Sequence, residues 1–318
     1  MKKIVLLGGT GFVGQALCER LVEQGDGAGT RITVPTRRLA HAKTVQFLPT
    51  VDPIECDVHD DEQLARLVAG HDAVVNLIAI LHGSANQFEH VHVRLLHRLA
   101  AACAAAGVKR VIHVSALGVG ADAPSNYLRS KAAGEAALQA AALDLSVLRP
   151  SVIFGAGDRF LNLFASLQAL FPVLPLAGVS AQFQPVWVND VARAILRCLQ
   201  DHATIGRIYE CAGPRVYTLR ELVQLAGRVC GHPRPVFELP QSLGQLQALA
   251  MEWLPGEPLM SRDNIQSMRV PNVATAQLPG LKDLGIEPAS LESVAPTYLA
   301  PRAGVSRLDH WRSLRRRA

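Results

Sequence analysis

Tyr127 and Lys131 are the residues whose types and spacing best suit acid–base chemistry in this chain. On a helix, residues four apart share a face, so the phenol and the ammonium group lie side by side. A cation about 4 Å away is worth up to roughly 4 kcal/mol at an effective dielectric constant near 20, or about three pKa units. We therefore expect Lys131 to lower the pKa of Tyr127 from about 10 toward neutrality and make it a general acid or base. Such pairs are also common on exposed helices; the position of this one after the fifth expected strand favours chemistry.

A glycine-rich turn near the start of the chain predicts the cofactor that would accompany this pair. It follows an apolar run at residues 2–7, precedes an amphipathic helix, and reads Gly8-Gly9-Thr10-Gly11-Phe12-Val13-Gly14. In this context glycines let a pyrophosphate approach the backbone amides of a helix N-terminus. We assign the tight turn to Gly8, clearance for the phosphates to Gly11 and close helix packing to Gly14. The pattern favours a dinucleotide over an ordinary strand-to-helix turn.

The end of the second expected strand indicates which dinucleotide binds. Residues 31–35 are followed by Thr36, Arg37 and Arg38, where an NAD-selective site would usually carry an acid for the ribose 2′-hydroxyl. Arginine can pair a 2′-phosphate in bidentate fashion, so NADP(H) is preferred and NAD(H) is the alternative. Two solvated arginines are the simpler explanation of the same residues. After the next strand, Asp57 and Val58 stand where an adenine could rest, although a loop cap explains Asp57 nearly as well.

Strands and helices alternate through the first half of the chain, which predicts an α/β fold with a Rossmann-type doubly wound parallel sheet. We expect strands at 2–7, 31–35, 51–55, 73–81 and 110–115, with helices between them. Residues 1–155 would form the dinucleotide-binding domain, residues 156–301 a smaller C-terminal substrate lobe, and residues 302–318 a basic tail. We place segments 184–199, 207–211 and 218–230 in the lobe; Thr218 and Glu221 make a capping box at the start of the last one.

Composition fits an enzyme-sized chain: 318 residues, 49% of them apolar. No signal peptide is apparent, so a cytoplasmic location is the default. The six cysteines have no paired spacing, and we expect small buried side chains, no disulfide and no zinc. His90, His92 and His97 come close together within an expected helix at 89–107, where a solvated or partly packed helix face is a better account than a metal site.

The net charge of +5 is located in the tail, because residues 302–318 hold six arginines and one aspartate. Nothing predicts a nucleic-acid partner, since neither a basic folded face nor aromatic platforms occur. Leu308, Trp311 and Leu314 alternate with arginines, a pattern typical of a short helix at an anionic membrane surface. A solvated terminus explains the tail equally well.

Taken together, these motifs resemble the extended or atypical short-chain dehydrogenase/reductase superfamily, which includes NAD-dependent epimerases and dehydratases. More narrowly, the chain is similar to bacterial relatives of the nucleotide-binding accessory subunit of mitochondrial complex I. Besides the glycine turn, the resemblance rests on segments 114–118, 127–131, 148–162, 184–192 and 261–264.

The resemblance implies a cofactor pocket and a set of catalytic residues. Tyr127 would be the acid or base, Lys131 its tuner and ribose anchor, and a serine or threonine the residue that orients the carbonyl. Ser115 ends the fifth strand, but the residue two places on, where many extended members carry the hydroxyl, is Leu117. Ser115 or Ser125 could take this role, or the third member is absent. The implied pocket consists of Gly8, Gly11, Phe12, Val13, Arg37, Asp57, Val58, Ala79, Lys131 and Pro150, with the nicotinamide near Phe154.

Two functions follow. The first is an NADP(H)-dependent oxidoreductase or epimerase-type enzyme acting on an apolar or sugar-like substrate. The second is a non-catalytic nucleotide-binding subunit or assembly factor associated with respiratory complex I or quinone metabolism, peripheral at the inner face of the membrane. Segments 160–164 and 170–176 are unusually apolar. Core packing is the first explanation for them; an apolar substrate such as a quinone, or contact with a membrane complex, is the second.

Overall fold

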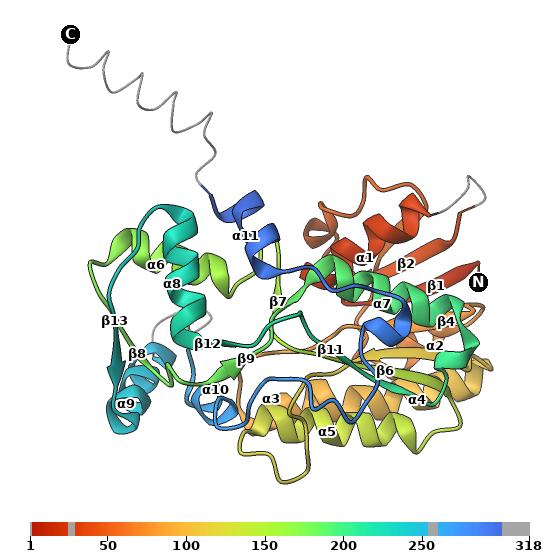
Figure 1. Cartoon of the computed structure of the whole chain (residues 1–318). Helices are drawn as coiled ribbons and strands as arrows, with labels where there is room; N and C mark the ends of the chain where they lie inside the picture. Colours follow the sequence, from red (N-terminus) through yellow and green to blue (C-terminus); the bar gives the residue numbers. More distant parts are fainter. Residues whose placement is uncertain (1, 25–28, 254–259, 301–318) are drawn as a thin grey trace.

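The computed structural model describes residues 2–24, 29–253 and 260–300, and its centre is a seven-stranded parallel sheet (Figure 1). The strand order is β11-β6-β5-β4-β1-β2-β3, and every pairing is parallel. The order reverses between β1 and β4, which opens a crevice at the carboxyl ends of these strands. The predicted Rossmann-type sheet is confirmed. The strands are β1 (Lys3–Leu7), β2 (Arg31–Thr36), β3 (Val51–Glu55), β4 (Ala73–Asn76), β5 (Arg110–Val114), β6 (Asp144–Pro150) and β11 (Ile208–Cys211).

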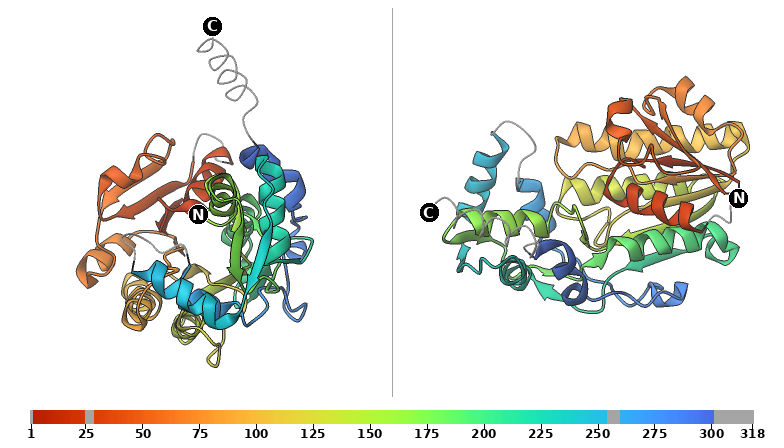
Figure 2. Two further views of the ribbon diagram at one scale, coloured as in Figure 1. Left: turned by 90° about the vertical axis from the view of Figure 1, so that its left-hand side faces the viewer. Right: turned by 90° about the horizontal axis from the view of Figure 1, so that it is seen from above.

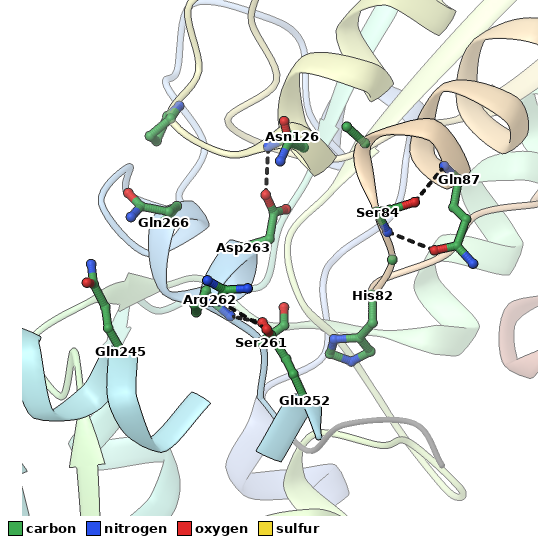
Figure 3. A pocket seen from close by; sticks show the side chains of 13 residues that line it. His82, Ser84, Gln87, Asn126, Gln245, Glu252, Ser261, Arg262, Asp263 and Gln266 are labelled. Atoms are coloured by element: carbon green, nitrogen blue, oxygen red, sulfur yellow. Dashed lines mark hydrogen bonds and ion pairs between the residues drawn. The ribbon is translucent and has the colours of Figure 1, made fainter. Parts of the chain in front are cut away.

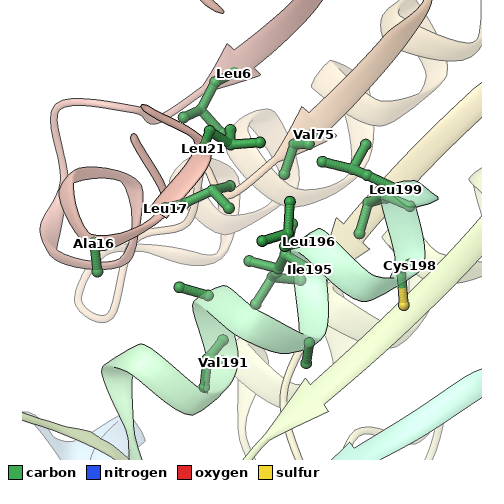
Figure 4. Packing of buried hydrophobic residues seen from close by; sticks show 14 of the residues in the cluster. Leu6, Ala16, Leu17, Leu21, Val75, Val191, Ile195, Leu196, Cys198 and Leu199 are labelled. Carbon is green, nitrogen blue, oxygen red and sulfur yellow. The ribbon is translucent and has the colours of Figure 1, made fainter. Parts of the chain in front are cut away.

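Helices cover both faces of this sheet, as the two views of Figure 2 show. On one face, α1 (Phe12–Glu23) and α7 (Val188–Gln200) pack on the strands and on each other. Figure 4 shows Leu17 and Leu21 of α1 near Ile195 and Leu196 of α7. The other face is covered by α2 (Asp61–Val68), α4 (Leu95–Ala106) and α5 (Asn126–Gln139). Strands covered on both faces need near-continuous apolar sequence, which is what β1 and β4 have.

The remaining elements build the second lobe around its own apolar core. Phe164, Leu174 and Leu176 lie in that core, so core packing explains part of the apolar segments at 160–164 and 170–176, whereas Leu170, Phe171 and Val173 are exposed. The capping box of Thr218 and Glu221 is confirmed at the start of α8. The lobe comprises β7 (Ile153–Phe154), α6 (Leu161–Leu170), β8 (Leu174–Ala177), β9 (Gln182–Phe183), β10 (Val186–Trp187), β12 (Tyr217–Thr218), α8 (Leu219–Cys230), β13 (Val236–Leu239), α9 (Gln241–Glu252), α10 (Arg262–Ser267) and α11 (Leu291–Leu299).

Two elements expected in the second lobe belong to the first unit instead. β11 pairs with β6 as an edge strand of the main sheet, and α7 packs against α1. The chain thus leaves the main sheet after β6, which ends at Pro150, and returns to it with α7 and β11. The strand expected at 73–81 is also shorter, since it ends at Asn76, whose Oδ1 accepts a hydrogen bond from the Ile78 amide at 3.3 Å.

Five of the six cysteines are buried, as expected, and Cys230 is partly buried. No helix in the described part of the chain is long and apolar enough to cross a membrane. The basic tail at 302–318 lies outside the described residues.

Candidate functional site

The glycine turn lies between β1 and α1, and three of its four glycines, Gly8, Gly11 and Gly14, have different surroundings. Gly8 has a φ of +80°, which favours glycine. At Gly14 a Cβ would lie 2.5 Å from the Gly8 oxygen and the Gly9 Cα, so close packing alone demands glycine there. Gly11 differs, because its φ is −80° and a Cβ would approach only the Gly8 oxygen, at 3.2 Å.

This open space at Gly11 is what a dinucleotide pyrophosphate needs. Gly11 is also the N-cap of α1 and offers no side chain to the first-turn amides of the helix. Those N–H groups remain available to an anion at the positive end of the helix dipole. The backbone of this turn therefore fits the phosphates of a dinucleotide. Thr10, Phe12 and Val13, the other residues expected at the cofactor, belong to the same turn and the start of α1.

Arg37 and Arg38 are exposed just beyond the carboxyl end of β2. Neither guanidinium has a hydrogen bond or ion pair within the described residues, and Thr36 binds only the backbone of Arg38, through its hydroxyl. On the neighbouring strand, Asp57 is exposed after β3 and accepts a hydrogen bond from the His59 amide at 3.0 Å, while Val58 is buried. The loop-cap explanation of Asp57 thus has a structural basis, and both loops lie at the carboxyl edge of the sheet.

Tyr127 and Lys131 lie on the first two turns of α5. The Lys131 side chain is only 2% exposed, and its Nζ donates a hydrogen bond to the Val114 carbonyl oxygen at 2.8 Å. Burial lowers the pKa of Lys131 to about 8, against an opposing effect of Glu135. Burial raises the pKa of Tyr127 to about 12. The expectation that Lys131 brings the tyrosine toward neutrality is therefore wrong, because desolvation of the phenol outweighs the ammonium, which is directed to a backbone oxygen.

His92 is a neighbour of this pair that the sequence analysis missed. It lies in a π-helix, Glu89–Arg94, and is 2% exposed rather than solvated. Its Nε2 accepts a hydrogen bond from the Ile80 amide at 3.1 Å, so its proton is on Nδ1, 2.8 Å from the Ser130 hydroxyl. Ser130 in turn donates to the Tyr127 carbonyl at 2.8 Å. The imidazole thus joins the loop after β4 to the helix of Tyr127.

This histidine is neutral at physiological pH, because burial, and then the Lys131 charge, lower the pKa of His92 to about 3. The ring centroid of His92 is 5.6 Å from that of Tyr127, in an edge-on arrangement. The ring centroid of Phe88 is 6.1 Å from that of Tyr127, also edge-on. Tyr127 is therefore held in an aromatic setting. The position within a π-helix, a feature common at functional sites, is visible only in the structure.

Two serines were candidates for the residue that orients a substrate carbonyl. Ser125 is the N-cap of α5 and accepts a hydrogen bond from the Leu128 amide, so its oxygen serves the helix. The Ser115 Oγ is buried and has no hydrogen-bond partner among the described residues. A buried hydroxyl in this state is one that a bound ligand could satisfy. Leu117 is buried, with its amide bonded to the Pro150 carbonyl at 2.9 Å.

The other members of the implied pocket have mixed surroundings. Ala79 is exposed in the loop after β4, whereas Pro150 is buried at the end of β6. The Phe154 side chain is fully buried in the core of the second lobe. Across the described ranges, no group of three or more His, Cys, Asp or Glu side chains is placed to hold a metal ion.

A polar cavity of ≈ 890 Å³ opens beside the N-terminus of α5 (Figure 3). Its walls come from the loop after β4, from α5 and from α9 and α10 of the second lobe. An ion pair between Arg262 and Glu252, with 3.0 Å between nitrogen and oxygen, lies on one side. Most of the labelled lining side chains carry amide, hydroxyl or charged groups: His82, Ser84, Gln87, Asn126, Gln245, Glu252, Ser261, Arg262, Asp263 and Gln266.

Comparison with known proteins agrees with this geometry. The sequence model of the NAD(P)H-binding family matches residues 8–159. NADH dehydrogenase (ubiquinone) 1 alpha subcomplex subunit 9, mitochondrial, of Mus musculus is 32% identical over 299 residues, which cover 90% of this chain and 77% of that protein. The 2-alkyl-3-oxoalkanoate reductase of Stenotrophomonas maltophilia is 27% identical over 320 residues, covering 90% of this chain and 94% of the reductase.

Among solved structures, a nucleoside-diphosphate-sugar epimerase from Staphylococcus aureus superimposes with a TM-score of 0.73 at 18% identity, covering 93% of this chain and 100% of that one. This likeness concerns the fold. The chain belongs to the extended or atypical short-chain dehydrogenase/reductase superfamily, within the family of the alpha subcomplex subunit 9 of mitochondrial NADH dehydrogenase (ubiquinone).

Proposed function

We propose that this chain binds NADP(H) at the carboxyl edge of its sheet and, with Tyr127 as proton donor, reduces a carbonyl group of a polar, sugar-like substrate. The observation that carries the cofactor choice is the pair of exposed guanidiniums, Arg37 and Arg38, which have no acidic partner in the described chain. A 2′-phosphate would supply the missing counter-charge, and planar guanidinium groups suit it geometrically.

Tyr127 is in the right state to be the proton donor in such a reduction. Burial raises the pKa of the phenol to about 12, so it is protonated at physiological pH and can give a proton to a developing alkoxide. When bound, the nicotinamide would supply the hydride. Lys131 holds a buried positive charge one turn further along α5, where a ribose hydroxyl could replace or join the Val114 oxygen as its acceptor. The unpartnered Ser115 hydroxyl would donate to the substrate oxygen.

Of the two substrate classes predicted from the sequence, the polar one fits better. Ten of the thirteen residues that line the cavity beside α5 carry amide, hydroxyl, imidazole or charged side chains. In the apolar segments at 160–164 and 170–176, Leu161, Phe164, Leu174 and Leu176 are used in the core of the lobe, whereas Leu170, Phe171 and Val173 are exposed. A ligand with many hydroxyl groups would satisfy these side chains, whereas an apolar one would leave them unpaired.

Calorimetric titration with NADPH and NADH tests the cofactor. We expect tighter NADPH binding in the wild type and loss of that preference in an Arg37→Ala, Arg38→Ala double variant. Arg66→Ala, which removes an exposed arginine of α2, is the matched control and should keep the preference. Equal affinities for the two cofactors in the wild type would refute the proposal.

A second candidate function is that of a nucleotide-binding subunit of a respiratory complex, which the similarity to the mouse subunit supports. Exposed apolar side chains on the second lobe also favour a protein partner: Leu170 is 74% exposed and Trp253 is 83% exposed, with Phe237, Leu243 and Leu246 also open to solvent. Co-purification of tagged chain with NADH:ubiquinone oxidoreductase activity tests this function. Leu246→Ser with Trp253→Ser should abolish the association, while an active reductase without any such association would favour the first candidate.

A further inference from the structure

The short helix α10 of the second lobe reaches across to the first turn of α5, the helix that carries Tyr127. Both oxygens of the Asp263 carboxylate accept backbone hydrogen bonds there, Oδ1 from the Asn126 amide at 2.8 Å and Oδ2 from the Tyr127 amide at 3.0 Å. The residues joined are more than 130 positions apart in the chain. Figure 3 shows the carboxylate pointing at the start of α5.

These amides belong to the group that a helix cannot satisfy by itself. The third donor of the turn, the Leu128 amide, is bound by the N-cap Ser125 at 3.2 Å. Ser125 itself accepts a hydrogen bond from Ser267 of α10 at 2.8 Å. A carboxylate at this end of the helix also interacts favourably with the helix dipole. The whole first turn of α5 is therefore held by side chains, and two of its three donors depend on the other lobe.

α10 is itself firmly placed, so it can position another element. A capping box between Ser261 and Asn264 closes its N-terminus, and Ile265 is buried against Ala177 and Ala248 of the lobe. Asn264 also donates its side-chain amide to the Leu81 carbonyl, at 3.3 Å, in the loop after β4. One six-residue helix thus contacts both the loop after β4 and the first turn of α5.

We infer that Asp263 is a positioning residue for α5, the helix that carries Tyr127 and the proposed ribose anchor Lys131, and that the second lobe thereby completes the nicotinamide half of the dinucleotide site. This inference rests on the proposed binding of NADP(H). The adenosine half is different, because the glycine turn between β1 and α1, and Arg37 and Arg38 after β2, all belong to the first unit and not to α5 or α10. Loss of the carboxylate should therefore weaken the two halves of the cofactor site unequally.

The test compares NADPH with 2′,5′-ADP, which carries only the adenosine half and the 2′-phosphate, on the full-length chain. In Asp263→Asn we expect about tenfold weaker NADPH binding, unchanged 2′,5′-ADP binding, and faster hydrogen exchange at the Asn126 and Tyr127 amides. The matched control is Asp283→Asn, which also removes a carboxylate that accepts from a backbone amide, that of Gly280 at 2.7 Å, and should change neither affinity.

A second variant approaches the contact from the other side. Asn126→Pro removes one donor to Asp263 at the first helical position, where proline is well tolerated, and keeps the second lobe intact. The preceding Ser125 has a φ of −102° and a ψ of 152°, which is compatible with a following proline. We expect the same selective loss of NADPH affinity, smaller in size, whereas Asn126→Ala should retain the wild-type affinity.

The possible results separate the inference from the function on which it rests. If the wild type binds neither ligand, the proposed function is refuted. If the wild type binds both and Asp263→Asn weakens NADPH alone, the positioning role is supported. Unchanged NADPH affinity despite faster exchange at the two amides would overturn it. Equal weakening of both ligands would also overturn it, since that is the result of a general loss of structure.

Discussion

Replacing Lys131 by methionine should change how the stability of the protein depends on pH. The wild-type ammonium is almost completely buried and donates a hydrogen bond to the backbone oxygen of Val114 at 2.8 Å. Methionine has a similar length and no charge, so it fills the space without the desolvation penalty. The exchange removes a charge that burial disfavours, together with a hydrogen bond worth about 1–3 kcal/mol.

The size of the effect follows from the lysine pKa, which falls from 10.5 to about 8 in the folded state. At about 1.4 kcal/mol for each pKa unit, this difference corresponds to about 3 kcal/mol. Between pH 8 and pH 10.5 the unfolded chain still binds the proton that the folded chain has released, so the Lys131 contribution makes stability rise with pH. Below pH 8 both states are protonated and the full penalty is present. The stability of Lys131→Met relative to wild type should therefore be greatest near pH 7 and decline by about 3 kcal/mol by pH 10.5.

Urea unfolding followed by circular dichroism at pH 7, 8, 9 and 10.5 under reducing conditions measures this difference directly. The cysteines and Tyr127 also affect the free energy of unfolding at alkaline pH, but they do so in both proteins. Their contribution therefore cancels when the free energy of unfolding of the wild type is subtracted from that of the variant. Lys109→Met, at an exposed lysine, is the control and should give a difference that does not change with pH. A constant difference for Lys131→Met as well would refute the reasoning, because it would mean that the ammonium titrates normally in the folded protein.

Further predictions concern the cofactor, the chemistry and the tail. Gly11→Val should abolish NADPH binding, measured by fluorescence titration, with an unchanged circular dichroism spectrum; retained NADPH affinity in this variant would mean that the turn is only structural. Gly14→Val should also lower the Tm, because its side chain meets backbone atoms. Tyr127→Phe should eliminate carbonyl reduction and leave the Kd for NADPH nearly unchanged, while Lys131→Ala weakens both; wild-type turnover in Tyr127→Phe would contradict the proton-donor role. The full chain should co-sediment with anionic liposomes at low salt, at about 1 kcal/mol per arginine, and a chain ending at Pro301 should not; equal binding of the two would make the tail a solvated end.

Much of the fold could be predicted from the sequence because the relevant interactions are local. Gly8 needs a positive φ and Gly14 a close backbone contact, so the glycine spacing indicates the turn whatever surrounds it. The strands β1 and β4 read as apolar runs since both faces of a parallel sheet are covered. The capping box at Thr218 joins residues three apart and was equally readable. The order of these signals along the chain was enough to predict the sheet and its first helices.

The sequence also determined which residue types are present for chemistry, but only the tertiary structure decided what their environment makes of them. The spacing of Tyr127 and Lys131 predicted a lowered tyrosine pKa, yet burial raises it, because desolvation depends on atoms brought in by distant segments. His92 was predicted to lie on a solvated or partly packed helix face, and the packing of the π-helix against α5 buries it almost completely. The contact between Asp263 and Tyr127 joins positions 136 residues apart, which no local pattern can reveal. Periodicity and spacing report on neighbours along one element, whereas burial and contacts between lobes arise only when the chain closes on itself.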